Sequence, residues 1–426
     1  MMKRIILSTV LVWGLLVSWA LAEKQEYSLD LSASTEYTDN LYLTQTDTVE
    51  DWMSLFTADF SATHSARLHS IIFNYEFTRA QYWRFPENNT NRHSLSLNYN
   101  QNLSQRLALG LGISYYKSEE PIERNPEIFR ERIGQREQYY RINIFHNISY
   151  NFAPGSVLEL GANINYLQNE SPETEDSRIY SEFIKITKDF TSFFVSMGFR
   201  GSQREFETSP QVNTWGYDLS AGYHIAHNKD LSLTYTAERT QDYGPGVNDY
   251  WVYNIQTTYT YRPSPDQTYY CSVGYYKRVS DDSSGDDNGL TYSLGYAKKF
   301  RRTTFTLDGS GGYRYEYGEA ENPGFTKYYL ISASISHQFT KTLSGSLQGM
   351  YRNENFKNEN REEDTYSFSL SLQKQLLKKL FLSADYSYRK RDSSGTNTGN
   401  ILDESYEENV VHVTLTYQFW RGRSLW

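Results

Sequence analysis

Residues 105–116 read QRLALGLGISYY, and this stretch decides the fold. Apolar side chains fall on alternate residues from Leu107 to Tyr115, with small or polar residues and Tyr116 between and after them. A period of two is typical of a β-strand, because successive side chains leave opposite faces of the pleat. The apolar face ends in a tyrosine beside a loop, as a lipid-facing wall ends in an interfacial belt of aromatic residues. The stretch therefore predicts one strand of a transmembrane β-barrel.

The same unit recurs along the chain: a strand, a short connection, a second strand and a long acidic or Asn-rich loop. Short periplasmic turns and long external loops alternate in this way in outer-membrane barrels. The predicted fold class is all-β, an antiparallel up-and-down barrel of about 20 strands. Eighteen strands is the alternative, if the hairpin at 178–205 is an extended loop. The predicted strands are 27–38, 51–63, 67–83, 91–101, 105–117, 137–152, 156–168, 178–189, 192–205, 213–227, 230–242, 249–262, 267–279, 289–300, 303–317, 326–339, 343–356, 363–375, 380–391 and 404–419.

The N-terminus has the pattern of a secretory signal peptide. Lys3 and Arg4 precede an apolar stretch at 5–20, and residues 20–22 (Ala-Leu-Ala) offer a cleavage site. We expect residues 1–22 to be a signal peptide cleaved near Ala22, and residues 23–426 to be one outer-membrane barrel of a Gram-negative bacterium. An uncleaved membrane anchor is the alternative, and the short apolar stretch argues against it.

The composition separates a membrane barrel from other classes of protein. Mean hydropathy is −0.68, and no later segment approaches the roughly 20 apolar residues of a membrane-spanning helix. The chain has 38 Tyr, 22 Phe and 8 Trp, an aromatic load that fits interfacial belts. A soluble β-sandwich is the alternative, but its strands typically run to about 5–6 residues. The single cysteine, Cys271, cannot form an internal disulfide and is expected in the barrel wall.

Side chains on the inward face should line the lumen and determine what passes. Most are neutral hydroxyls and amides, and the charged ones are of both signs with no ring of one sign. Such a wall suits small hydrated solutes or a neutral glycan chain; the alternative is that these residues only hydrate the lumen. The long segment 118–137 is expected to fold inward and narrow any pore. The lumen-lining candidates are Tyr116, Arg141, Tyr270, Tyr276, Arg314, Glu316 and Arg352.

The sequence does not predict catalysis, since it has no H-E-x-x-H, G-x-S-x-G or P-loop motif and its 8 histidines are dispersed. The acidic loop at 280–289 has oxygen-rich side chains that calcium prefers, but it lacks the ordered spacing of an EF-hand and is better explained as a solvated loop. We expect no catalytic residue, no cofactor, no bound metal and no nucleic-acid partner.

The opening of the mature chain, residues 34–62, resembles the start of the outer-membrane β-barrel porins associated with PEP-CTERM/exosortase and exopolysaccharide loci. The shared features are the Tyr-Thr-Asp-Asn turn at 37–40 and the Leu-Tyr-Leu triplet at 41–43. Residues 93–121 are similar too. The chain departs from the family's Ser-Pro-Gly in strand two, with Ala-Asp-Phe-Ser at 58–61. The resemblance implies an integral barrel that serves exopolysaccharide secretion or cell-envelope assembly, and it implies no site residues.

Two classes of function follow from these features. The first is a porin-like channel for exopolysaccharide or polar solutes, and the second is a non-transporting barrel. The latter is structural, adhesin-like or a sheath for a periplasmic partner such as a multihaem cytochrome. The expected partners are outer-membrane lipid, lipopolysaccharide, the barrel-assembly machinery and periplasmic polysaccharide-export components.

Overall fold

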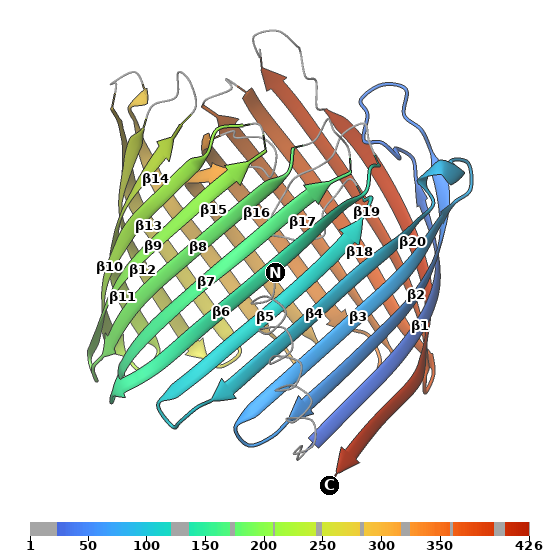
Figure 1. Ribbon diagram of the computed structural model, residues 1–426, viewed down its shortest axis with the longest axis horizontal. Helices are drawn as coiled ribbons and strands as arrows, with labels where there is room; N and C mark the ends of the chain where they lie inside the picture. The colour runs from blue at the N-terminus through green and yellow to red at the C-terminus, as the bar shows by residue number, and fades with distance from the viewer. Residues whose placement is uncertain are drawn as a thin grey trace, which may run out of the picture.

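The computed structural model describes residues 24–120, 136–170, 175–207, 209–243, 249–281, 285–316, 324–357, 361–395 and 405–425. The predicted signal peptide lies outside these residues. Within them the chain forms one 20-stranded sheet that closes on itself (Figure 1). The strands are β1 (Lys24–Thr38), β2 (Asp51–Ser65), β3 (His69–Tyr82), β4 (Thr90–Asn102), β5 (Leu107–Ser118), β6 (Tyr139–Ala153), β7 (Ser156–Asn169), β8 (Ser177–Asp189), β9 (Phe193–Phe206), β10 (Val212–Ala226), β11 (Lys229–Asp242), β12 (Tyr250–Ser264), β13 (Gln267–Ser280), β14 (Asp287–Lys299), β15 (Thr303–Glu316), β16 (Gly324–Gln338), β17 (Leu343–Phe356), β18 (Arg361–Leu377), β19 (Leu380–Gly395) and β20 (Tyr406–Leu425).

The barrel closes because the first and last strands pair. Each strand is antiparallel to its neighbour along the chain, and β1 pairs with β20 in a register that joins Thr38 to Val410. The strands are tilted, with the short turns at one end of the barrel and the long connections at the other (Figure 1). The alternative of 18 strands required the hairpin at 178–205 to be an extended loop. This hairpin is formed by β8 and β9, which pair along their length. The prediction of about 20 strands is confirmed.

The outward face carries an apolar band between two belts of aromatic rings. Mid-strand residues of the band include Ile184, Leu294 and Leu370, all exposed on the outside of the wall. Aromatic belts at both edges of an apolar band are typical of barrels that cross a membrane. Outward rings near the long loops include Tyr37, Trp52, Trp83, Trp215, Trp251, Tyr329 and Tyr351, and those near the short turns include Tyr150, Phe193, Tyr269, Tyr296 and Phe305.

The last strand is longer than predicted. Instead of ending near 419, β20 continues to Leu425, because its last residues pair with the start of β1. Pairing with β19 stops at Tyr417, so the end of β20 extends beyond β19 at the short-turn end. The described residues include one short 3-10 turn, Pro86–Asn88, between β3 and β4. Among these residues no helix is long and apolar enough to cross a membrane.

Candidate functional site

The lumen wall is the candidate site, and the strand register defines it. Directly paired residues point to the same side of a sheet, so the inward face can be followed from strand to strand. On β12 this face carries Asn254, Gln256 and Thr258. A polar cavity of about 350 Å³ lies against the serines of β17 and β18. Its lining comprises Ser336, Ser344, Gly345, Ser346, Ser371, Gln373, Ser383 and Asp385.

The loop between β1 and β2 folds into the lumen. Leu41 is fully buried, and it packs on Met53, Leu55 and Ala80, which lie on the inward faces of β2 and β3. Leu43 is also fully buried. The apolar triplet at 41–43, quoted for the family resemblance, therefore covers the wall from inside and narrows the long-loop end.

Polar contacts hold this loop at the seam where the barrel closes. The Asp39 carboxylate accepts hydrogen bonds from the backbone N–H and the side-chain amide of Asn409, at 2.7 and 2.8 Å. Asn40 donates to the backbone oxygen of Glu407 at 2.9 Å, and its own amide oxygen accepts from the Thr44 N–H at 2.9 Å. Asp39 and Asn40 therefore tie the first loop to the last strand.

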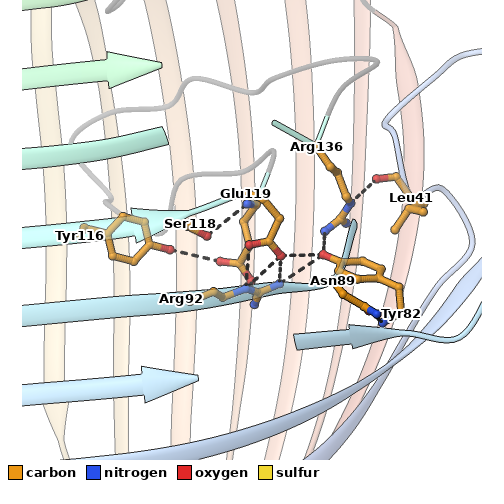
Figure 2. A network of polar contacts seen from close by, with 9 residues as sticks. Leu41, Tyr82, Asn89, Arg92, Tyr116, Ser118, Glu119 and Arg136 are labelled. Carbon is orange, nitrogen blue, oxygen red and sulfur yellow. Dashed lines mark hydrogen bonds and ion pairs between the residues drawn. The ribbon is translucent and has the colours of Figure 1, made fainter. Parts of the chain in front are cut away.

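A buried ionic network lies beside this loop (Figure 2). The Arg92 guanidinium donates to Glu119, with contacts of 3.0 and 2.6 Å, and to Glu120 at 2.6 Å. The Tyr82 hydroxyl donates to the same Glu119 carboxylate at 2.6 Å. Arg92 is 7% and Glu119 is 1% exposed. Two acids held by one buried arginine fix the end of β5 against β3 and β4.

Arg136 contacts the inward loop from the far end of the β5–β6 connection. Its guanidinium donates to the Leu41 carbonyl and to the Tyr82 hydroxyl, both at 2.8 Å (Figure 2). The segment 118–137 was predicted to constrict the pore, and residues 121–135 of it lie outside the described residues. The described ends are both tied to the β1–β4 side of the lumen. Among the described residues, the segment that folds over the inner wall at this end is the shorter β1–β2 loop.

A second cluster narrows the opposite side of the long-loop end. Tyr276 packs with Tyr250, Phe325 and Tyr313, and the Arg278 guanidinium lies 4.1 Å from the centre of the Tyr250 ring. Tyr276 faces inward, as its register with Asn254 requires. However, it is 1% exposed, so its ring cannot stack with a passing solute. This corrects the predicted role of Tyr276, whose ring is part of a packed cluster.

Two other predicted aromatic residues line the wall with part of their surface exposed. Tyr116 is paired with Arg141 in the register of β5 and β6, and both face inward. The Tyr116 hydroxyl donates to Glu120 at 3.4 Å, which links it to the Arg92 network. Tyr270 faces inward on β13 and donates to Asp308 at 2.9 Å. Both tyrosines are therefore oriented by carboxylates.

The predicted charged lining is organised as ion pairs. Arg314 and Arg352 both contact the Glu354 carboxylate, Arg352 at 3.0 Å. The Glu316 side chain lies outside the described ones. Two further pairs, Arg391 with Glu363 and Arg200 with Glu238, also face inward. The sequence indicated scattered charges, whereas the structure gathers arginine–glutamate pairs toward the long-loop half of the lumen.

Carboxylates gather lower in the lumen, across three neighbouring strands. Asp30 on β1 is directly opposite Asp59 on β2, which is directly opposite Glu76 on β3. Asp59 and Glu76 are exposed and Asp30 is half-buried. Like charges in this arrangement repel and would be costly in a dry interior. The row therefore indicates that this level of the lumen is hydrated.

The acidic loop at 280–289 was weighed as a calcium site. In its described part, Asp286 accepts from the Ser280 N–H at 2.9 Å, and Asp287 pairs with Lys327 at 2.7 Å. Asp282 lies outside the described residues. Among the residues that the structure describes, no group of three or more His, Cys, Asp or Glu is arranged to hold a metal.

The structure also reveals inward rings that the sequence analysis did not single out. Phe145 on β6 and Phe183 on β8 lie over Gly112 and Gly161 respectively, where any side chain would overlap the ring. Despite this contact they are 40% and 45% exposed, on the lumen side. The signal was present in the inward parity of Asn143, Phe145 and Asn147.

The comparisons with known proteins bear on the fold and the family. Residues 271–419 match the family model described as "Putative beta-barrel porin 2". A search of curated proteins finds no match. The matched range does not include residues 34–62, on which the resemblance was argued. The match supports the predicted resemblance to a β-barrel porin family over residues 271–419, while the association with PEP-CTERM/exosortase and exopolysaccharide loci stays a prediction.

Solved outer-membrane proteins share the architecture at low sequence identity. A variant of the ferric enterobactin receptor PfeA from Pseudomonas aeruginosa, in complex with enterobactin, has a TM-score of 0.55 and 8% identity over 93% of this chain and 82% of that one. The copper transporter OprC has a TM-score of 0.54 and 11% identity, over 92% and 80%. The ferric-catecholate import receptor Fiu from E. coli K12 has 0.53 and 9%, over 92% and 81%. At these identities the likeness shows the fold alone. The protein is thus a porin-like outer-membrane β-barrel, and its residues 271–419 are similar to the β-barrel porin family that the model describes.

Proposed function

We propose that the barrel is a channel for polar solutes and that a neutral glycan, such as a secreted exopolysaccharide, is the cargo that its lumen suits best. The observation that carries this proposal is the inward face, where hydroxyl and amide side chains recur along β12, β17 and β18. Such groups both donate and accept hydrogen bonds. They can therefore exchange partners with water and with sugar hydroxyls along the whole path.

Hydration of the lumen supports passage over a purely structural role. The row of Asp30, Asp59 and Glu76 places like charges side by side, an arrangement that solvation by water favours. The folded-in β1–β2 loop weighs against a sheath around a protein partner such as a multihaem cytochrome, since a sheath needs a wide lumen. In an export role, periplasmic polysaccharide-export components would deliver the polysaccharide to the end of the barrel that carries the short turns.

Liposome swelling tests passage itself. Vesicles that contain the refolded protein should swell in stachyose, a neutral tetrasaccharide, faster than protein-free vesicles do. The matched control is protein-loaded vesicles in a dextran too large to enter. If swelling in stachyose equals that of protein-free vesicles, the barrel does not pass neutral sugars and the channel proposal is wrong for this cargo.

A gene deletion separates export from uptake. Loss of the protein should lower the amount of surface polysaccharide while leaving the periplasmic pool intact or enlarged. A strain that still secretes its polysaccharide and loses only the uptake of small solutes would leave a diffusion porin and exclude export.

A further inference from the structure

One part of the lumen wall forms a cavity with both aromatic and polar side chains in its lining. A cavity of about 570 Å³ lies along β6 to β11, and the exposed rings of Phe145 and Phe183 form its apolar part. Each ring rests on a glycine of the preceding strand, Gly112 and Gly161. The glycines let the rings lie close to the wall, so that each ring turns its free face to the lumen.

Asparagines surround the Phe145 ring. Asn143 and Asn147 flank Phe145 on the inward face of β6, and Asn163 is directly opposite Phe145 on β7. The side-chain oxygens of Asn143 and Asn163 are buried and find no hydrogen-bond partner among the described residues. Because both oxygens are buried, each can accept a hydrogen bond from a ligand only after its side chain rotates toward the cavity.

The charge at the edge of the cavity is balanced. Arg200 borders the cavity and pairs with Glu238 at 2.9 Å. Arg204 and Glu182 also line the cavity, so both signs of charge are present in its lining. Around Phe145 the polar side chains are neutral amides, which both donate and accept. Arg200 is directly opposite Phe183, where its charge is balanced by Glu238. A hydroxylated, uncharged ligand matches amides of this kind, and its C–H faces match aromatic rings.

We propose that Phe145, Phe183 and the asparagines around Phe145 form a subsite that binds a neutral saccharide chain on the lumen wall. Phe145 and Phe183 stand on alternate strands and are offset by two residues along them, which places them roughly 12 Å apart, so they would contact different sugar units of one chain. The inference rests on the proposed function, because it assigns a saccharide-binding site to the lumen of the channel.

The test is calorimetric binding to the purified, detergent-solubilised barrel. The probes are cellohexaose, a neutral hexasaccharide, and hexagalacturonate, its acidic counterpart. The wild-type protein should bind cellohexaose and bind it more tightly than hexagalacturonate. The variant Phe145→Leu/Phe183→Leu keeps an apolar cover on both glycines but removes the rings, and it should bind cellohexaose at least fivefold more weakly.

Phe194→Leu is the matched control, because the Phe194 ring also rests on a glycine, Gly222, but lies outside the cavity. It should bind cellohexaose as the wild type does. Three results would each overturn the subsite: no binding to the wild type, equal loss in the Phe194 variant, or preference for hexagalacturonate. Swelling of vesicles in stachyose is measured on the same preparations. A barrel that passes stachyose without binding cellohexaose disproves the subsite alone, and one that does neither disproves the channel as well.

Discussion

Arg92 is buried near the long-loop end and holds two carboxylates. Removing one partner of a buried ion pair leaves uncompensated charge and typically costs about 3–5 kcal/mol. We expect Arg92→Ala to lower the free energy of unfolding by that amount. The measurement is urea unfolding in lipid vesicles, followed by tryptophan fluorescence.

Arg84 supplies the control, because it makes a similar 2.7 Å contact with Glu50 where both side chains are at least half exposed. Exposed pairs contribute about 0–1 kcal/mol, so Arg84→Ala should change stability little. Equal losses in the two variants would show that the Arg92 network is not buried as described.

Individual residues also show which features could be predicted from the sequence and which could not. Alternation places Tyr116, Tyr270 and Tyr276 on the inward face, as the register does. It cannot tell that Tyr276 is enclosed, because burial there comes from Phe325, which is distant in the chain. The contact of Arg314 with Glu354, which Arg352 also contacts, could not be predicted for the same reason. Arg314 lies on β15 and Glu354 on β17, and these strands come together only because both pair with β16.

At the scale of a strand, the two faces should respond differently to charge. Leu370 points outward and Ser369 inward in the middle of β18. Leu370→Arg should cost about 2–4 kcal/mol and reduce barrel assembly, because the charge meets the lipid midplane. Ser369→Arg should assemble normally, since it enters a polar lumen. Heat-modifiable gel mobility measures both, and the reverse ranking would mean that the faces of β18 are interchanged.

The loop between β1 and β2 is expected to set the width of the opening. Leu41→Ala removes a fully buried side chain from its cluster, which typically costs about 2–5 kcal/mol, here the free energy that keeps the loop folded inward. The mean single-channel conductance should therefore rise. Leu103→Ala, in an exposed short turn, is the control. Unchanged conductance in the Leu41 variant would exclude the loop as a constriction.

Strands were predictable and loops were not, for one physical reason. A strand of the wall repeats its environment every two residues, so β5 and β17 could be placed within two residues of their observed bounds. A loop that folds inward has no such repeat in its sequence. The burial of Leu41 depends on Met53 and Ala80, and the anchoring of Asp39 depends on Asn409 at the other end of the chain.

For the whole molecule, the orientation follows from the placement of long and short connections. We expect the long loops to face the outside of the cell. In a Cys271→Ala background, Glu170→Cys at the long-loop end should react with an impermeant maleimide on intact cells, because Glu170 is exposed. Asn228→Cys, in a short turn, should react only after lysis. Labelling of Asn228→Cys on intact cells would show that the short turns, and not the long loops, face the outside of the cell.

The central claim is that twenty strands enclose a hydrated lumen that connects the two sides of a membrane. Conductance across a planar lipid bilayer tests it most directly, with folding checked beforehand by heat-modifiable mobility. Insertion of folded wild-type protein should produce discrete, repeated steps of ionic current. Folded protein that inserts yet leaves the membrane current unchanged, in the wild type and in Leu41→Ala alike, would contradict the account.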